Sequence, residues 1–288
     1  MTNAIVVVGS LHYDIMVQAP DRPRKGETVT GQKWYPKFGG KGGNQAVAAA
    51  RAGAQTRFVG AVGQDGFADL MRTTLHENGI DTDHIATVSD HGTGMSVAII
   101  DAEGDYGAVI VSGANLLIDV AQFDNPALWQ DAKILILQNE VPEAVNIAAA
   151  RQARSHGLQT CINAAPWRAL PSDLIKLVDI VVVNALEAED MGSYPVTDLI
   201  SAEQAAISLT DKVPTAIVTA GGGGVAWARR GQDSGALPAC PVDVVSTHGA
   251  GDMFIGSLCY QIAQGTDLGA AIQAANIAAA AHISKPHD

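Results

Sequence analysis

The sequence predicts an α/β protein: a three-layer αβα sandwich with a mainly parallel central sheet and a small β-sheet lid. From residue 133 onward, short apolar runs alternate with helical patterns, which is the order that builds a parallel sheet covered by helices. Two other segments, about 11–37 and 93–111, break this alternation, and we expect them to form the lid. We predict a single domain over residues 1–288.

Five β-rich apolar runs predict the strands of the central sheet. They lack strict alternation, as expected for strands that helices cover on both faces. The runs are residues 5–9, 133–138, 158–163, 179–184 and 214–219. A helix is expected over 142–156, because Pro142 stands near its start and Gly157 follows its end.

The two lid segments differ in character. Residues 11–37 are polar, contain three prolines and carry a basic cluster of Arg22, Arg24 and Lys25. Residues 93–111 predict a β-hairpin with a turn at 101–104. A small sheet projecting from the main layers is where a cover over a site would come from.

Composition excludes several classes of protein. The 288 residues are 47% hydrophobic, so the chain is not disordered, and the 30 glycines follow no three-residue period. The net charge of −12, from 18 basic and 30 acidic residues, argues against binding nucleic acid, which needs lysine and arginine to neutralise phosphates. A small anionic ligand is still possible, but local groups of the chain must then compensate its negative charge.

Compartment signals favour a cytoplasmic protein. The three cysteines are far apart and show no metal-ligand spacing, which argues against a disulfide scaffold or a zinc site. The first ten residues lack the basic start and the long apolar run of a signal peptide. The alanine-rich run at 274–283 is too short for a membrane span and predicts a buried helix.

Residues 246–265 give the strongest local signal for chemistry. Gly249, Ala250 and Gly251 start an amphipathic helix that ends at Gly265, and a helix start with small residues binds anions through its free N–H groups. Asp252 lies in the first turn. Either it only complements the helix dipole, or it takes a proton from a hydroxyl that attacks a phosphoryl group held by those amides.

Two further glycine clusters are present. Residues 38–54 predict a flexible turn over Gly39–Gly43 leading into a helix capped by Gly53, and residues 219–227 follow a strand. Either cluster is a tight turn or a contact for a phosphate. Neither has the spacing of a Walker A loop or of the dinucleotide fingerprint, so a Rossmann-type dehydrogenase is poorly supported.

Taken together, these clusters resemble one family. An early GGKGGNQ helix, an NxxE pair after a strand, a glycine-rich turn and a late GAGD helix start resemble the ribokinase-like (PfkB) family of carbohydrate kinases over nearly the whole chain. Within it, the ribokinases are most similar, through GETVTGQKWYPKFGGKGGNQAVAAARAGA, VGAVGQDGFADLMRTTLHENGID and VSGAN. The resemblance implies ATP-dependent phosphorylation of a primary hydroxyl of a small sugar, with D-ribose as the first candidate.

The resemblance also assigns roles at the reacting centre. It makes Asp252 the catalytic base and the amides of Gly249, Ala250 and Gly251 an anion hole for the γ-phosphate. The sugar hydroxyls would be bound by Asp14, Gly40, Lys41, Asn44, Glu140 and Asp252. Two of these have a plainer alternative, because Asp14 could cap a turn and Glu140 could be a charge at a helix start.

The nucleotide side is assigned in the same way. Asn184 and Glu187 match the pair that organises Mg²⁺ and the phosphates, partly through water. The turn beside the phosphates and the nucleotide ribose would contain Thr219, Gly221, Gly222 and Gly224. Asn276 lies where the family's last helices flank adenine, or is simply a polar residue on an alanine-rich helix.

The chain departs from the family at three places. Ser246 replaces an aspartate that supports a monovalent-cation site, and the sequence ends at SKPHD, where the family's cation loop would follow. We therefore expect weak or absent activation by K⁺. His12 stands where ribokinases have asparagine beside the sugar, and a larger, titratable side chain could reshape the pocket for another acceptor.

Several alternatives stay open at this point. One is a nucleoside kinase or a kinase for another pentose or a ketohexose, and another is a non-catalytic sugar- or nucleotide-binding protein. Family lids pair between subunits, so a homodimer through the lid is implied, without nucleic-acid or membrane partners. Against the negative net charge, the candidate positive groups for the phosphates are Lys41 and the lid's Arg22, Arg24 and Lys25.

Overall fold

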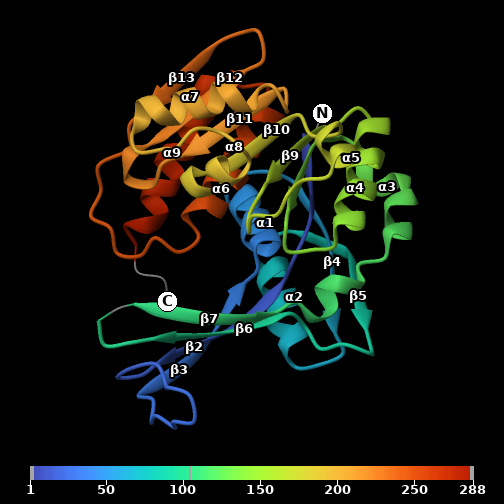
Figure 1. Ribbon diagram of the computed structural model, residues 1–288. Helices are drawn as coiled ribbons and strands as arrows, with labels where there is room; N and C mark the ends of the chain where they lie inside the picture. The colour runs from blue at the N-terminus through green and yellow to red at the C-terminus, as the bar shows by residue number, and fades with distance from the viewer. Residues whose placement is uncertain (1–2, 104, 286–288) are drawn as a thin grey trace.

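The computed structural model describes residues 3–103 and 105–285. Within them the chain forms a nine-stranded sheet in the order β13-β12-β11-β10-β9-β8-β1-β4-β5 and a four-stranded sheet in the order β3-β2-β6-β7. In Figure 1 helices cover the larger sheet, while the smaller sheet projects from it as a lid. The predicted fold class is therefore confirmed.

The larger sheet is mainly parallel. All pairs from β11 to β5 are parallel, and only the β11–β12 and β12–β13 pairs at one edge are antiparallel. Its strands are β1 (Ala4–Val8), β4 (Thr56–Gly63), β5 (Asp81–Val88), β8 (Ala132–Gln138), β9 (Gln159–Asn163), β10 (Ile180–Asn184), β11 (Thr215–Thr219), β12 (Val225–Arg229) and β13 (Ser234–Leu237). The bounds of the five strands predicted from the sequence are correct to within one residue.

Helices cover both faces of this sheet. One face packs against α1 (Lys41–Ala52), α2 (Phe67–Glu77), α8 (Ala250–Ala263) and α9 (Leu268–Ile283). The other packs against α3 (Pro126–Trp129), α4 (Glu143–Ser155), α5 (Ser172–Ile175), α6 (Ala185–Asp190) and α7 (Leu199–Leu209). Short 3₁₀ segments are η1 (Gly113–Leu117), η2 (Val120–Asp124) and η3 (Gly221–Gly223).

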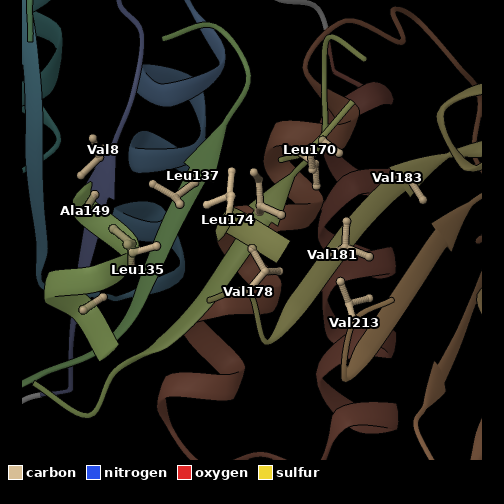
Figure 2. Packing of buried hydrophobic residues seen from close by; sticks show 14 of the residues in the cluster. Val8, Leu135, Leu137, Ala149, Leu170, Leu174, Val178, Val181, Val183 and Val213 are labelled. Atoms are coloured by element: carbon tan, nitrogen blue, oxygen red, sulfur yellow. The ribbon is translucent and has the colours of Figure 1, made fainter. Parts of the chain in front are cut away.

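Strand β8 is apolar on both of its faces, so apolar and polar residues do not alternate along it. Ile134 and Ile136 face the α1 and α8 side, whereas Leu135 and Leu137 face the α4 side, because successive side chains of a strand point to opposite faces. Figure 2 shows Leu135 and Leu137 beside Ala149 of α4. Two separate apolar layers therefore fix the sheet between the helices.

The lid contains both segments that break the alternation. Residues 11–37 contribute β2 (His12–Gln18) and most of β3 (Lys33–Gly39), and residues 93–111 contribute the hairpin of β6 (Met95–Ile100) and β7 (Tyr106–Val111). The two halves join through a parallel pairing of β2 with β6. Residue 104, in the predicted turn, lies outside the described residues.

The glycine-rich start of α1 differs from the flexible turn that we expected. The helix already begins at Lys41, so Gly42 and Gly43 lie in its first turn. A Cβ on Gly42 would lie 2.5 Å from the backbone nitrogen of Ser10, and Gly40 has a φ of +88°. These glycines let α1 begin directly against the end of β1.

No helix within residues 3–103 and 105–285 combines the length and apolar character that crossing a bilayer requires. The alanine-rich α9 instead buries Leu268, Ala271, Ile272 and Ala275 against the sheet and α8.

Candidate active site

The site lies where the strand order reverses. The chain adds β4 and β5 on one side of β1, then returns to place β8, β9, β10 and β11 on the other side. At such a point the connections after neighbouring parallel strands diverge and leave a crevice at the carboxyl edge. Ser10 follows β1 and Glu140 follows β8, and the Ser10 hydroxyl donates to Glu140 Oε2 at 2.5 Å.

A cavity of about 160 Å³ opens at this edge. It is lined by residues from α1, the ends of β9, β10 and β11, and the start of α8: Lys41, Asn163, Ala165, Val182, Val183, Asn184, Glu187, Thr219, Thr247, Gly249, Ala250, Gly251, Asp252, Phe254 and Ile255. Eight residues predicted from the sequence, taken from four separate segments, meet here: Lys41, Asn184, Glu187, Thr219, Gly249, Ala250, Gly251 and Asp252.

Asp252 is buried, with 8% of its surface exposed. The Gln45 side-chain amide donates to its Oδ1 at 2.9 Å, and the Asn44 amide donates to its Oδ2 at 3.3 Å. Burial raises the pKa of Asp252 above its usual value, and the charge of Lys41 opposes that rise. A residue that only complemented the helix dipole would not need this burial or these two donors.

The amides before Asp252 are arranged to receive an anion. Gly249 is the N-cap of α8 in the left-handed region, at φ 76°. Within residues 3–103 and 105–285, the N–H groups of Gly249 and Gly251 have no acceptor, while the Ala250 N–H reaches Thr247 O at 3.3 Å. Two of the three predicted amides are therefore open at a positive helix end.

Glu140 contacts the start of α1. Its Oε2 accepts from the backbone N–H of Lys41 at 2.8 Å as well as from Ser10. Helix α4 begins only at Glu143, so Glu140 is not a charge within that helix. The carboxylate instead joins the ends of β1 and β8 to α1, next to the Lys41 side chain that lines the cavity.

Asp14 and His12 lie on β2, at the root of the lid. Ser96 of β6 donates its hydroxyl to Asp14 Oδ1 at 2.5 Å, so Asp14 does not cap a turn, and burial raises the pKa of Asp14. His12 is buried, with Nδ1 4.0 Å from Glu140 Oε2, and no described residue bonds its Nε2. Neither side chain lines the 160 Å³ cavity.

Asn184 and Glu187 have a structural role that the sequence analysis missed. Asn184 is the N-cap of α6, and the two residues form a reciprocal capping box, with Asn184 Oδ1 accepting from Glu187 N and Glu187 Oε2 from Asn184 N. The capping box alone would therefore also account for the spacing between Asn184 and Glu187. Both nonetheless line the cavity, and burial raises the pKa of Glu187.

The donor set fits magnesium that arrives with a nucleotide. Among the described residues, no three histidine, cysteine or acidic side chains are grouped as a metal cage. Mg²⁺ prefers oxygen ligands, keeps several waters and is held by one or two carboxylates together with phosphate oxygens. Glu187 supplies one such carboxylate at the cavity, and the Asn184 side-chain oxygen, which caps α6, lies beside it.

Other predicted nucleotide residues lie away from this cavity. Gly221 and Gly222 belong to η3, the turn of the hairpin from β11 to β12, and a Cβ on Gly224 would lie 2.1 Å from Leu237 O. Asn276 donates its side-chain amide to Pro238 O at 2.8 Å, which ties α9 to the loop before α8. Thr219 alone of the turn residues lines the cavity.

The lid's basic cluster does not line this cavity. The Arg22 guanidinium forms ion pairs within the lid, with Asp101 at 3.4 Å and Asp105 at 3.0 Å. Arg24 and Lys25 are exposed on the loop between β2 and β3. Of the four positive groups considered from the sequence, only Lys41 lines the cavity.

Ser246 is used within its own loop. Its hydroxyl accepts from the backbone N–H of His248 at 3.3 Å, and its own N–H donates to Ile283 O at 3.2 Å. The carbonyl of Ile283 also accepts from Val245 N at 2.8 Å. The hydroxyl and the N–H of Ser246 and the carbonyl of Ile283 are therefore all hydrogen-bonded within the protein.

Two residues that are hydrogen-bonded to the catalytic candidate, one directly and one through the other, were missed. Gln45 Nε2 lies 2.9 Å from Asp252 Oδ1 and 3.2 Å from Asn163 Oδ1, so it connects α1, α8 and the end of β9. Gln45 lies one turn after Lys41, and Asn163 ends a strand whose carboxyl end faces the site. Helical spacing and the strand-end rule could have drawn attention to both.

A second, larger cavity of about 490 Å³ lies between β3, α1, α2 and the ends of α8 and α9. It shares Gly249 and Asp252 with the first cavity. Its other lining residues are Pro36, Lys37, Phe38, Asn44, Val47, Ala48, Arg51, Leu70, Thr74, His248, Met253 and His282. Asp252 therefore borders both cavities, and Asn44 lines the larger cavity.

The chain is similar to known proteins over nearly its whole length. The model of the pfkB family of carbohydrate kinases matches residues 2–288. The ribokinase of Haemophilus influenzae is 34% identical over 287 residues, which cover 99% of this chain and 94% of that protein. The deoxyribokinase of Salmonella typhi is 33% identical over 281 residues, covering 96% and 91%.

A solved structure of similar fold is that of Arabidopsis thaliana ribokinase complexed with ribose and ATP. It matches with a TM-score of 0.92 at 26% identity, over 100% of this chain and 94% of that one.

Proposed function

The chain belongs to the PfkB family of carbohydrate kinases, and from this premise we propose that it transfers the γ-phosphoryl group of ATP to the primary hydroxyl of D-ribose. The single observation that supports this most is the meeting of Asp252, Lys41 and the open amides of Gly249 and Gly251 at one cavity. That combination provides a base, a positive charge and an anion-binding helix start within reach of one transferring group.

Asp252 acts as the base in this proposal. Its carboxylate takes the proton as the sugar oxygen forms a bond to the γ-phosphorus, while the bond from that phosphorus to the β,γ-bridging oxygen breaks and ADP leaves. Because burial raises the pKa of Asp252, its carboxylate holds a proton more strongly than an exposed one. Asn44 and Gln45 hold the carboxylate through its two oxygens.

Fixed groups around the cavity would stabilise the negative charge of the phosphoryl group during its transfer. The Gly249 and Gly251 amides and the Lys41 ammonium group lie around the cavity and would stabilise the phosphoryl oxygens. Glu187 would help to hold magnesium that arrives with the nucleotide, and the ion would supply further positive charge. These groups would receive an anion despite the chain's net charge of −12.

The acceptor is proposed from its relatives and from buried polar groups. The Haemophilus influenzae relative is a ribokinase and the Arabidopsis thaliana structure contains ribose and ATP. Asp14 and Glu140 are two largely buried carboxylates near α1 and the lid root, and carboxylates accept hydrogen bonds from neighbouring sugar hydroxyls. Asn44 adds an amide that lines the 490 Å³ cavity.

Coupled ADP release across a set of acceptors tests this function. We expect D-ribose to give the highest kcat/KM, above 2-deoxy-D-ribose, a ketohexose and a nucleoside. Preference for 2-deoxy-D-ribose or a nucleoside would replace the acceptor but keep the kinase. Sugar and ATP binding without ADP release from any acceptor would instead indicate a non-catalytic binding protein.

Potassium is expected to have little effect on the rate. Position 246 offers a hydroxyl rather than a carboxylate, and the nearby Ile283 carbonyl already accepts two backbone N–H groups. We predict that kcat changes less than about twofold when KCl replaces a large organic cation at equal ionic strength. A steep rise of kcat with KCl would contradict this prediction.

The lid edge is a candidate dimer surface. Strand β7 is an edge strand, and Val109, Ile110 and Val111 on it are 68%, 56% and 53% exposed. An exposed apolar edge pairs readily with another chain, and a second copy offers the same edge. We propose a homodimer formed through the lid sheets.

Sedimentation velocity tests this assembly. Ile110→Asp places a charge in the proposed interface, and we expect it to convert the dimer to a monomer. Ile200→Asp is the matched control, because Ile200 is a 71% exposed isoleucine on α7, outside the lid. A wild-type monomer, or a dimer that survives Ile110→Asp, would rule out pairing through this edge.

A further inference from the structure

The loop of residues 238–249, which leads into α8, is hydrogen-bonded to α9 at three places. At its start, Asn276 donates to Pro238 O at 2.8 Å. In its middle, Ile283 O accepts from the amides of Val245 and Ser246. At its end, His282 Nε2 lies 3.0 Å from His248 O. The third contact falls directly before the open amides of the anion hole.

The chemistry of this last contact requires a hydrogen on Nε2 of the His282 ring. A backbone carbonyl only accepts hydrogen bonds, so His282 must donate from Nε2. In a trans peptide the C=O and the following N–H point in opposite directions. Because His282 holds the His248 carbonyl on the α9 side, the N–H of Gly249 is directed away from α9. Gly249 itself lines the 160 Å³ cavity.

The imidazole also lies against Gly249 itself. A Cβ at Gly249 would be 3.1 Å from His282 Nε2, and Gly249 has the left-handed φ of 76° that favours glycine. The peptide before Asp252's helix is thus held both by its backbone conformation and by a side chain from α9. His282 lines the 490 Å³ cavity together with Asn44 and Asp252.

We propose that His282 is a positioning residue for phosphoryl transfer: it holds the His248–Gly249 peptide so that the Gly249 amide faces the transferring phosphoryl group. This role rests on the proposed kinase function and goes beyond it, because neither the family resemblance nor the sugar and nucleotide assignments involve His282. It assigns the end of α9 a part in the rate of the reaction rather than in acceptor binding.

Substitution of the histidine gives a specific kinetic pattern. His282→Ala removes one hydrogen bond to the peptide, and a net hydrogen bond is worth a factor of about five to ten in an equilibrium or rate. We expect kcat to fall about five- to tenfold while KM for the sugar stays within twofold. His282→Gln, which keeps a side-chain donor, should recover part of the lost kcat.

Chemical rescue separates donation from packing. His282 and the exposed His248 both line the 490 Å³ cavity, so a small molecule can reach the space that His282→Ala leaves. Added imidazole should raise kcat of His282→Ala and leave the wild type unchanged. Either an unchanged kcat in His282→Ala, or a reduced kcat that neither imidazole nor His282→Gln raises, would overturn the proposal.

Amide hydrogen exchange provides a readout that needs no activity. We expect His282→Ala to speed exchange over residues 245–251, because the peptide loses its fixed partner. His156→Ala is the matched control, since His156 Nδ1 likewise bonds a carbonyl, Gln152 O at 2.9 Å, at the end of another helix, α4. It should leave kcat and exchange in that segment unchanged.

The two proposals can fail separately. If the wild type phosphorylates none of the acceptors, the proposed function fails, and exchange over residues 245–251 still decides the role of His282. Exchange that stays unchanged in His282→Ala would overturn that role, even in an enzyme that phosphorylates ribose at a high rate.

Discussion

Replacing Asp252 with asparagine should lower kcat by a factor of about 10²–10⁴ and leave the affinity for ATP nearly unchanged. In the proposed function, the substitution removes the group that takes the proton from the attacking hydroxyl. In the proposed function, the nucleotide is bound mainly by other groups that line the cavity, among them Glu187, Thr219 and the helix amides. Steady-state ADP release gives kcat, and calorimetry with a non-hydrolysable ATP analogue gives the affinity.

A matched control removes a carboxylate with only a dipole role. Asp69 is an exposed acid in the first turn of α2, as Asp252 is in the first turn of α8. Asp69→Asn should leave kcat unchanged. Asn44 and Gln45 both donate to the carboxylate of Asp252. In Asp252→Asn the side-chain NH₂ group would therefore face one of these donors instead of accepting from it, which could destabilise the fold. The thermal midpoint therefore has to be recorded for each variant. A folded Asp252→Asn with wild-type kcat would exclude Asp252 as the base.

The central sheet could be predicted from the sequence because its signal is local. A run such as 133–138 is apolar at every position, and only a strand covered on both faces explains this in so short a segment. The lid could be recognised as an interruption, but its strand order could not. The parallel pairing of β2 with β6 joins residues about 80 positions apart, and no local pattern encodes that register.

The same limit applies to the site. Asp252, Lys41 and Glu187 stand within recognisable motifs, so their meeting was expected. Gln45 was not, because its role depends on Asp252 and Asn163, which lie 207 and 118 positions away. The capping box at Asn184 shows the reverse case, since a motif assigned to a ligand also has a purely local structural function.

The distribution of charge in the fold changes how the acidic composition is understood. The basic cluster of the lid does not line the 160 Å³ cavity, and its Arg22 is paired with Asp101 and Asp105. In the proposed function, compensation for the charge of an anionic substrate comes from a few groups at the carboxyl edge of the sheet. One is the Lys41 side chain, and the others are backbone amides, which add no formal charge to the chain.

Lys41→Met should therefore have the second largest effect, a loss of about 10²–10³ in kcat, as expected when a group that stabilises developing charge is removed. Methionine keeps a side chain of similar length and retains the backbone N–H that donates to Glu140. The loss would then report the ammonium charge. Lys133→Met, at an exposed lysine on β8, is the control and should leave kcat unchanged.

The pH dependence of the same variant shows whether Lys41 also controls the base. Burial raises the pKa of Asp252, and the charge of Lys41 lowers it. Activity requires the ionised carboxylate, so kcat/KM falls as the pH drops through the pKa of Asp252. Without Lys41 the effect of burial is less opposed and that pKa rises further. The acidic limb of kcat/KM should then move to higher pH in Lys41→Met and stay in place in Lys133→Met. A limb that does not move would show that Lys41 acts on the phosphoryl group without setting the protonation of Asp252.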